Sequence, residues 1–481
     1  MRKAWTFLLA ALALTGCAAA PADTLPAEST AETAETTTAE TEEAAQPVGF
    51  AVGSLTEFPN TCGGYWGWNT GDAYYEIARQ YESEDDYNIM HALLLKTDYA
   101  TAQQTVLCNV PGCTHDNAAC PAWLEEWART DLLVMPSGIY LSYAGLDNVY
   151  PWEQVEKACR DDFEQGNVKN FADEEEYIAY CRKNYERDCR PSTIEKLNDD
   201  LTARETVLTY DPSLLGGGYF AYCDENALYA KDYSDPNSNS ILRLDLTTGE
   251  WSSISLNLGE QVQGVYGHRF LTSRLLTDAP LPDYSDREAY DAAMQNARTE
   301  LVWLDPETMQ REKICETGDL NSDTIFVKIY KDRIYVQDNP QTNSSYGTNY
   351  SLSYYGKDHQ RTVLIDTLPM NLYLPSTGNG FMPVFGTEER SWIWAQDYVG
   401  STETDYLVDL DTGELKTMTQ TQYRDGVYMA VSLMAQTNDG RWMIGYKPHS
   451  ERHNDRCDYG FIDPQEFWDG GENYTPVQMW D

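Results

Sequence analysis

Short clusters of apolar and aromatic residues recur along this chain, and turn-forming residues separate them. Six clusters have the same length of three residues and occupy 139–141, 228–230, 270–272, 334–336, 392–394 and 442–444. Three such residues bounded by turns are typical of a short buried β-strand. The distance between successive clusters is mostly 42 to 64 residues, close to the ~40–50 residues of a four-stranded propeller blade.

A second repeat follows two of these clusters, at the point where a strand ends in aspartate. Residues 244–250 read LDLTTGE and residues 408–414 read VDLDTGE. The spacing from Tyr229 to Asp245 and from Ile393 to Asp409 is 16 residues in both copies. Aspartate followed by Thr-Gly forms tight turns, so we expect each copy to close a β-hairpin.

The two signatures divide the chain into about seven units. These units occupy roughly 75–125, 130–212, 214–258, 262–317, 323–367, 378–420 and 425–480. The sequence therefore predicts an all-β fold, a β-propeller of about seven blades over residues 50–481, with six or eight blades also compatible. A pair of β-sandwich domains is the alternative, but it does not explain why most units carry the same signatures.

Two of the units contain segments with helical spacing. Trp152, Val155, Cys159 and Phe163 fall on one helical face, and a second helix is predicted after Asp173. We expect residues 151–206 to form a helical insertion on one rim, with the flanking strands 139–141 and 207–209 paired. A shorter helix is predicted at 286–294.

The beginning of the chain resembles a bacterial lipoprotein signal peptide. Arg2 and Lys3 precede an apolar stretch at 5–14, which is followed by Leu14-Thr15-Gly16-Cys17. This resembles a lipobox, and the resemblance implies cleavage after residue 16 and lipidation of Cys17. An ordinary signal peptide cut near 18–20 is the alternative.

Residues 17–49 are predicted to be a tether between the anchor and the propeller. Positions 21–46 contain seven acidic residues and no basic one, and they consist almost wholly of Ala, Thr, Glu and Pro. Such a segment cannot bury enough apolar surface to offset the entropy of ordering, so we expect it to be disordered.

Composition excludes some partners. The 481 residues include 34 Lys and Arg against 77 Asp and Glu, which gives a formal net charge of -43. Nucleic-acid binding requires a basic surface, so no nucleic-acid partner is expected. The predicted location is the cell membrane, lipid-anchored on the extracytoplasmic face.

The strongest concentration of chemically reactive residues lies at 107–122. Its sequence, LCNVPGCTHDNAACPA, resembles the LC-x-x-P-x-C-x-H-x-x-x-x-C-x-A segment of uncharacterised propeller-like lipoproteins of anaerobic Gram-positive bacteria. The long cysteine-containing insertion departs from that pattern. The resemblance implies an architecture and a membrane anchor but no reaction.

The cysteines of this segment leave three alternatives open. Cys108, Cys113 and Cys120 can form disulfides together with Cys62, as expected for an exported chain with an even number of remaining cysteines. The same three thiols and His115 can instead form an S₃N structural zinc site, although their spacing is unusual. Free thiols are the third alternative. His449, His453 and Cys457 form a weaker metal-binding pattern in a predicted loop.

The sequence contains no complete catalytic motif such as G-x-S-x-G, H-E-x-x-H or a Walker loop. It therefore favours a non-enzymatic binding module whose ligand is an unidentified glycan, peptide or protein. A glycan-processing hydrolase or lyase on a propeller and a structural protein of envelope assembly are the alternatives.

Overall fold

The computed structural model divides the chain into two units, Met1–Ala45 and Gln46–Asp481. Only the second unit contains described residues, so residues 1–49, which include the predicted signal peptide, Cys17 and the predicted tether, lie outside them. The described residues are 50–58, 67–81, 89–125, 129–146, 150–168, 171–215, 220–231, 239–257, 260–277, 286–295, 297–319, 325–338, 351–367, 372–373, 384–386, 391–397, 405–424, 427–449 and 456–480.

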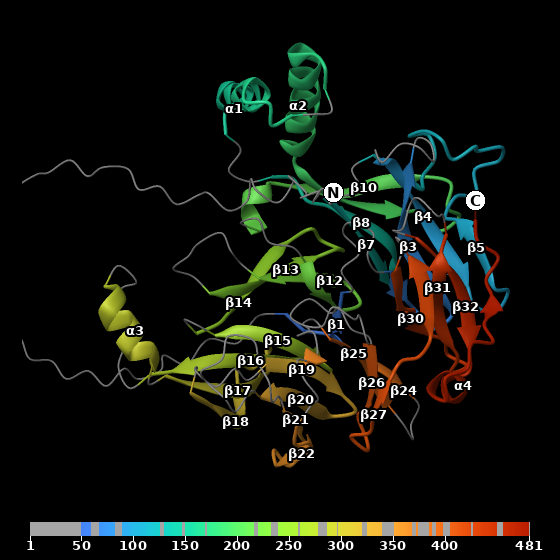
Figure 1. The fold of residues 1–481 in the computed structure, drawn as a ribbon. Coiled ribbons are helices and arrows are strands. Elements are labelled where there is room, and N and C mark those ends of the chain that lie inside the picture. Colours follow the sequence, from blue (N-terminus) through green and yellow to red (C-terminus); the bar gives the residue numbers. More distant parts are fainter. Residues whose placement is uncertain are drawn as a thin grey trace, which may run out of the picture. The chain divides into compact units, whose positions relative to one another are not determined.

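The first three sheets of this unit follow one another in chain order (Figure 1). Blade 1 contains β2 (Trp68–Asn69), β3 (Ala73–Tyr81), β4 (Ile89–Asp98), β5 (Gln103–Val106) and β6 (Trp123–Leu124). Blade 2 contains β7 (Thr130–Met135), β8 (Gly138–Tyr143), β9 (Ser192–Leu197) and β10 (Arg204–Tyr210). Blade 3 contains β11 (Phe220–Cys223), β12 (Ala227–Lys231), β13 (Ser240–Asp245) and β14 (Trp251–Ser255), with β1 (Thr56–Glu57) paired to β11.

Four further sheets complete the series. Blade 4 contains β15 (Gln261–Tyr266), β16 (Arg269–Leu276), β17 (Arg298–Leu304) and β18 (Arg311–Asp319). Blade 5 contains β19 (Ile325–Tyr330), β20 (Arg333–Asp338), β21 (Ser351–Tyr355) and β22 (Arg361–Ile365). Blade 6 contains β23 (Leu372–Tyr373), β24 (Val384–Gly386), β25 (Ser391–Asp397), β26 (Asp405–Asp409) and β27 (Leu415–Thr417). After a hairpin of β28 (Thr421–Arg424) and β29 (Val427–Ala430), blade 7 contains β30 (Ser432–Gln436), β31 (Trp442–Pro448), β32 (Cys457–Ile462) and β33 (Thr475–Pro476).

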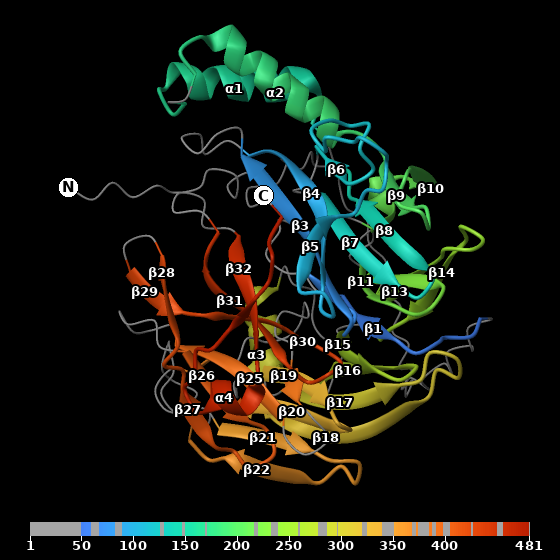
Figure 2. The ribbon, with the colours of Figure 1, turned by 90° about the vertical axis from the view of Figure 1, so that its right-hand side faces the viewer.

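The buried apolar side chains connect these sheets into a closed ring. Among the described residues they form seven clusters, and each cluster takes its members from at least two neighbouring blades. The cluster that closes the ring packs Tyr459 and Phe461 of blade 7 against Tyr74 of blade 1. The predicted β-propeller is confirmed, with seven blade sheets in the described part of the chain (Figure 2).

Both sequence repeats have a structural explanation. The three-residue clusters lie in β8, β12, β16, β20, β25 and β31, one in each of blades 2 to 7. The aspartate turns join β13 to β14 in blade 3 and β26 to β27 in blade 6. Asp245 Oδ1 accepts hydrogen bonds from the backbone N–H groups of Thr247 and Thr248, at 2.9 and 3.0 Å. Asp409 Oδ1 does the same for the two residues at the matching positions. Gly249 and Gly413 both have φ of 74°, which explains why glycine recurs there.

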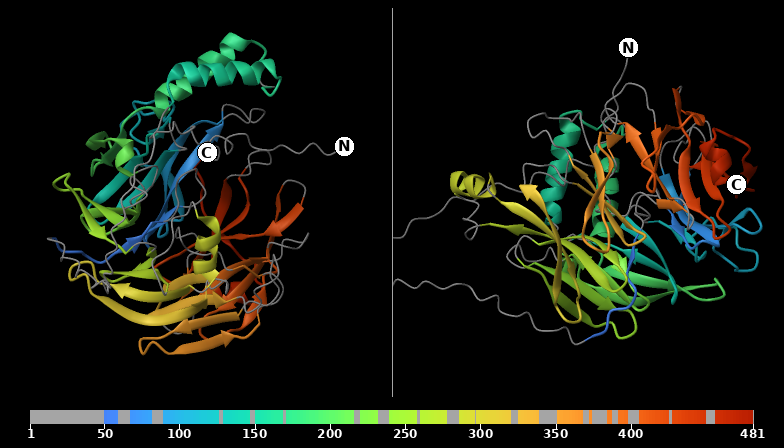
Figure 3. Two further views of the ribbon diagram at one scale, coloured as in Figure 1. Left: turned by 90° about the vertical axis from the view of Figure 1, so that its left-hand side faces the viewer. Right: turned by 90° about the horizontal axis from the view of Figure 1, so that it is seen from below.

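The helices form close to where the sequence predicts them, but the insertion in blade 2 is shorter than expected. The chain contains α1 (Trp152–Glu164), α2 (Glu174–Asp188), α3 (Arg287–Gln295), α4 (Pro464–Trp468) and a 3₁₀ turn at Pro212–Leu215. Asp173 caps α2 by accepting a hydrogen bond from the N–H of Glu176 at 3.0 Å. The α1–α2 hairpin projects beyond the strands in Figures 1 and 2 and in the left view of Figure 3.

The prediction that 151–206 is wholly an insertion is wrong at its C-terminal end. Residues 192–197 form β9, which pairs with β8 and with β10, so β8 does not pair with residues 207–209. Ile194 and Leu197 are buried in β9 and pack against neighbouring blades. This short strand follows directly on the second helix, and its apolar residues at 194 and 197 are also compatible with helical spacing.

The C-terminal segment is hydrogen-bonded to blade 1, and these bonds help to close the ring. Gln478 forms a parallel bridge with Gln103, and its carbonyl oxygen accepts a hydrogen bond from the N–H of Gln104 at 2.9 Å. The buried Gln104 side chain donates from Nε2 to Glu76 Oε1 at 2.7 Å. Tyr459 of blade 7 donates its hydroxyl to the other oxygen of Glu76 at 2.7 Å. Glu76 therefore joins the first blade to the last.

Glu76 gives the closure a pH dependence that can be measured. Burial raises the pKa of its carboxyl above the ordinary value of 4.5. The folded state therefore holds this proton more strongly than the unfolded state, and the resulting stability is lost as the pH rises from about 4.5 through the folded pKa. We expect the Glu76→Gln variant to gain stability relative to the parent across that window, by about 1.4 kcal/mol for each unit of pKa shift.

The measurement is the unfolding free energy of both proteins at pH 4 and pH 8. Any pH-independent effect of replacing the carboxyl by an amide cancels in the difference between the two pH values. Glu205→Gln on the exposed face of β10 is the matched control and should show no such change. A difference between parent and Glu76→Gln that is the same at both pH values would contradict the prediction.

Candidate metal centre

The outer edge of blade 1 is shared by two short strands. β5 pairs with the C-terminal half of β4, and β6 pairs with Ala92 and Leu93 in its N-terminal half. The segment between β5 and β6 is a loop, and both of its ends are hydrogen-bonded to the backbone of Leu94. The N–H of Leu107 donates to the Leu94 carbonyl at 2.9 Å, and the Leu94 N–H donates to the carbonyl of Ala122 at 3.0 Å. Residues 107–122 therefore form a closed loop on the blade edge.

Four candidate ligands converge inside this loop. The Sγ atoms of Cys108, Cys113 and Cys120 and a ring nitrogen of His115 all lie within 4.8 Å of one another. His115 Nδ1 lies 3.3 Å from Cys120 Sγ. A tetrahedral zinc ion with Zn–S of ~2.3 Å and Zn–N of ~2.0 Å requires ligand separations of roughly 3.5–3.8 Å. The four side chains fit such an ion after only small movements.

Local turns bring these ligands together. The N–H of Cys113 bonds to the carbonyl of Val110 at 3.1 Å across Pro111 and Gly112, and Gly112 has φ of 74°. His115 also adopts a left-handed conformation, with φ of 59°, which turns the chain between the second and third thiols. A further turn is closed by the N–H of Cys120, which bonds to the carbonyl of Asn117 at 3.0 Å. The unusual ligand spacing thus follows from three consecutive turns.

The three thiols differ in their surroundings. Cys120 is buried against the core of blades 1 and 2, and burial raises its pKa to about 12. The backbone N–H of His115 is the main cause that lowers the pKa of the Cys113 thiol. A bound cation would replace the thiol protons of all three cysteines. Because the protein fills all four positions of a tetrahedron, the centre has the form of a structural site.

The other sequence-predicted candidates are not brought to this loop. None of the nine cysteines in the described part of the chain is joined to another by a disulfide, so none of the expected disulfides is formed there. Cys62 and Cys17 lie outside the described residues. His449 Nδ1 lies 2.6 Å from Asp458 Oδ1 instead of joining a metal site, and His453 is also outside the described residues. Cys108, Cys113, His115 and Cys120 form the one metal-type cluster among the residues described.

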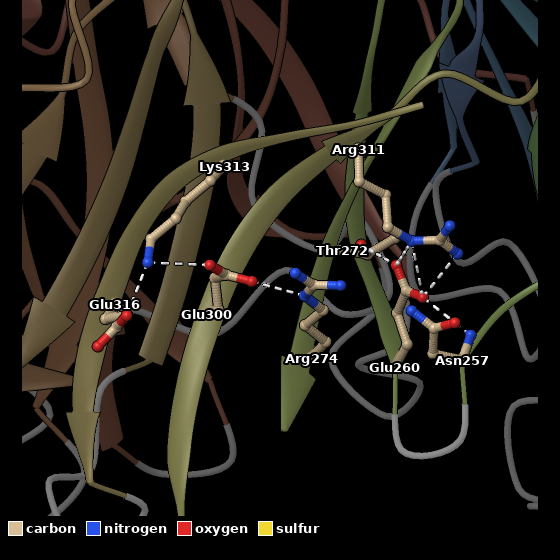
Figure 4. Close-up of polar contacts among 8 residues, drawn as sticks. All are labelled: Asn257, Glu260, Thr272, Arg274, Glu300, Arg311, Lys313 and Glu316. Atoms are coloured by element: carbon tan, nitrogen blue, oxygen red, sulfur yellow. Dashed lines mark hydrogen bonds and ion pairs between the residues drawn. The ribbon is translucent and has the colours of Figure 1, made fainter. Parts of the chain in front are cut away.

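A network of charges in blade 4 was not predicted from the sequence (Figure 4). Glu260 is completely buried, and its carboxylate accepts hydrogen bonds from Thr272 Oγ1 at 2.6 Å and from Arg311 Nη2 at 2.9 Å. Glu300 on β17 is paired with Arg274 on β16 and Lys313 on β18. Protein donors surround both carboxylates, so this network is structural and offers no free catalytic acid.

Most of the exposed large apolar side chains lie on blade 2, on its helical hairpin or in the turn that follows the blade. Seven large apolar side chains are exposed among the described residues, and five of them lie between 146 and 214: Leu146, Tyr150, Tyr180, Val207 and Leu214. Tyr150 and Tyr180 are the most exposed aromatic residues of this set, at 62% and 51%. This distribution has no signal in the sequence, because exposure depends on which helix faces pack.

The base of the hairpin brings part of this surface together. The N–H of Leu146 donates to the carbonyl of Asp188 at 2.9 Å, and the Tyr185 hydroxyl donates to the carbonyl of Tyr150 at 2.9 Å. Gly145 lies so close to its neighbours that an added Cβ would be 2.2 Å from the Arg190 carbonyl oxygen and 2.9 Å from Pro212 Cγ. The segments that carry Leu146 and Leu214 therefore meet at the base of the hairpin.

No protein-family model and no curated protein matches this chain. The β-propeller domain of the trilobed protease from Pyrococcus furiosus, whose topology is described as open velcro, is 9% identical over 87% of this chain and 96% of that one, with a TM-score of 0.40. A puromycin hydrolase complexed with PGG is 10% identical over 85% of this chain and 53% of the hydrolase chain, with a TM-score of 0.42. An oligogalacturonate lyase in complex with manganese is 12% identical over 58% and 69% of the two chains, with a TM-score of 0.34. Similarity at this level concerns the fold alone.

No helix in the described ranges is long and apolar enough to cross a membrane.

Proposed function

We propose that this chain is a lipid-anchored extracytoplasmic binding protein whose propeller presents a peptide or protein partner with the rim of blade 2 and the α1–α2 hairpin. The gathering of five of the seven exposed large apolar side chains on residues 146–214 is the observation that carries this proposal. Grouped apolar residues on a soluble surface mark interaction sites. Leu146, Val207 and Leu214 are aliphatic, which favours an apolar polypeptide surface over a sugar ring.

The proposed anchor agrees with this role. Two or more acyl chains on Cys17 would give stable membrane attachment. The acidic segment 21–46 would then act as an extended spacer that lets the propeller reach a partner away from the membrane.

Structural zinc is the second part of the proposal. The ion is held by four ligands, Cys108, Cys113, His115 and Cys120. It fixes the conformation of the loop 107–122 at the edge of blade 1. The closeness of all four ligand atoms in one loop supports this assignment. Zinc supplies stability here, since no ligand position is left for a substrate.

The binding proposal is tested with the soluble fragment 47–481 on peptide and glycan arrays. We expect peptide binding that weakens by about tenfold or more in a Tyr150→Ser, Tyr180→Ser double variant, because truncated aromatic anchors often cost more than 1 kcal/mol. Val363→Ser is the matched control, since Val363 is 49% exposed but lies on β22 of blade 5. Binding to glycans alone, or equal loss in the control, would contradict the proposal.

Replacement of Cys17 tests the anchor directly. We expect Cys17→Ser to remain unlipidated, and to be found as precursor or in the soluble fraction instead of the membrane fraction, because the thioether cannot form. Cell fractionation and intact-mass analysis of both proteins provide the measurement. If the variant stays in the membrane fraction to the same extent as the parent, Cys17 is not the anchor. Cys315→Ser in blade 4 is the control and should fractionate like the parent.

A further inference from the structure

Two cysteines face each other across the helical hairpin. The antiparallel helices are in contact through Phe163 and Tyr177, whose ring centroids are 6.2 Å apart. Cys159 lies four residues before Phe163 on α1, and Cys181 lies four residues after Tyr177 on α2. Four residues are about one helical turn. Each cysteine therefore lies one turn away from the Phe163–Tyr177 contact, on the face of its helix that packs against the other helix.

The contact at the other end of the hairpin agrees with this register. Trp152 at the start of α1 packs against Tyr185 on α2 with centroids 5.3 Å apart. Cys159 and Cys181 lie between these two aromatic pairs, and both side chains are half-buried. Burial raises the pKa of Cys159 to about 12, and a hydrogen bond with the Cys181 thiol contributes to the rise. The two thiols are thus direct neighbours.

Cys189 does not compete with Cys159 as a partner of Cys181. Cys189 follows Cys181 by eight residues at the end of the same helix, which places it about 12 Å further along the axis. A disulfide requires Cα atoms within about 7 Å, so Cys189 is too far from Cys181 to pair with it.

Few side chains of the hairpin are fully buried. α1 has no buried residue, and Ile178 is the one buried residue of α2. Surface ion pairs such as that of Arg160 with Glu174, at 2.8 Å, add little in water. A covalent link would therefore change the order of this element far more than it would change a propeller blade.

We propose that Cys159 and Cys181 form a reversible disulfide that joins α1 to α2 and holds the exposed face of the hairpin rigid. In the oxidation, one thiolate attacks an external disulfide, such as that of an oxidised small thiol or a thiol oxidoreductase, and releases one of its sulfurs as a thiol. The second thiolate then attacks the mixed disulfide and releases the remaining sulfur of the external disulfide as a second thiol. The pair loses two electrons and two protons, and the external disulfide becomes two thiols. The disulfide itself is independent of the proposed function. The effect of the disulfide on partner binding rests on the proposed function.

The test uses the purified full chain in buffers of oxidised and reduced glutathione. Peptide mapping after alkylation should show residues 159 and 181 linked in the oxidised protein and both alkylated after reduction. The variants Cys159→Ser and Cys181→Ser should lack the link, and Cys189→Ser, the matched control, should keep it. Two alkylatable thiols in the oxidised protein, or a link from either cysteine to Cys189, would overturn the proposal.

Amide hydrogen exchange provides a second measurement, which needs no variant. Reduction should speed exchange in α1 and α2 by about tenfold or more, with no change in blade 4, because the cross-link restricts opening of the hairpin alone. Unchanged exchange in the helices would refute the rigidifying effect. Peptide binding is then compared between the two redox forms. A link that forms without changing binding would refute its effect on partner binding and leave the disulfide itself established.

Discussion

Replacement of Cys120 by serine is expected to abolish zinc binding and to lower the stability of the propeller. The parent should carry about one zinc ion per chain, and the Cys120→Ser variant none, because the hydroxyl group is a poor replacement for a thiolate ligand. Binding to the folded state alone stabilises a protein by about 4 kcal/mol when free zinc is a thousand times its dissociation constant. The loop 107–122 covers the outer edge of blade 1, so its release also exposes part of the core formed with blade 2.

Metal analysis and chemical denaturation with and without a chelator measure these two effects. The chelator should lower the stability of the parent and leave that of Cys120→Ser unchanged, since the variant has no ion to lose. Cys315→Ser is the matched control, because Cys315 is also a half-buried cysteine outside any disulfide but lies on β18 of blade 4. A parent that contains no metal after purification in zinc-supplemented medium would eliminate the zinc assignment.

Replacement of Arg311 by methionine is expected to destabilise the propeller by about 3–5 kcal/mol. The variant leaves the completely buried carboxylate of Glu260 without its cation, and an uncompensated buried charge is strongly unfavourable. Methionine retains most of the side-chain volume, so a cavity contributes little to the loss. The double variant with Glu260→Gln should recover part of the stability, because the amide is neutral and can still accept from Thr272.

A pair on the surface of the same blade provides the control. Arg269 and Glu312 form an ion pair at 2.9 Å, but their side chains are 31% and 57% exposed. Arg269→Met should therefore cost no more than about 1 kcal/mol. Denaturation curves of the parent and the three variants give the loss of unfolding free energy for each substitution. Equal losses for Arg311→Met and Arg269→Met would mean that burial of Glu260 does not set the strength of its ion pair.

Much of the fold could be predicted because the signals of a propeller blade are local. The aspartate of each LDLTTGE-like turn bonds to backbone N–H groups only two and three residues ahead, so the turn can be recognised in the sequence. The helical hairpin was predicted for the same reason, from spacing and from the Asp173 cap. The strand β9 was missed because its pairing with β8 spans the whole hairpin.

The candidate metal centre was only partly predictable. Its four ligands lie within 13 consecutive residues, so the sequence identified them as a group. It left open whether the thiols bond to each other or surround an ion, because that choice depends on distances set by three turns and by the two bonds to Leu94. The structure brings all four ligand atoms together and forms no disulfide among the cysteines described.

The repeat, the number of units to within one, the two helices of the insertion and the group of metal-type ligands could all be recognised from the sequence. The tertiary structure alone decided how the ring closes, through Gln478 beside Gln103 and through Glu76 between the first and last blades. It also decided that Glu260 is neutralised by Arg311 and that Cys159 faces Cys181. The reason is physical: turns, caps and spacing arise from neighbours along the chain, whereas burial and pairing of distant side chains arise only when the blades pack against one another.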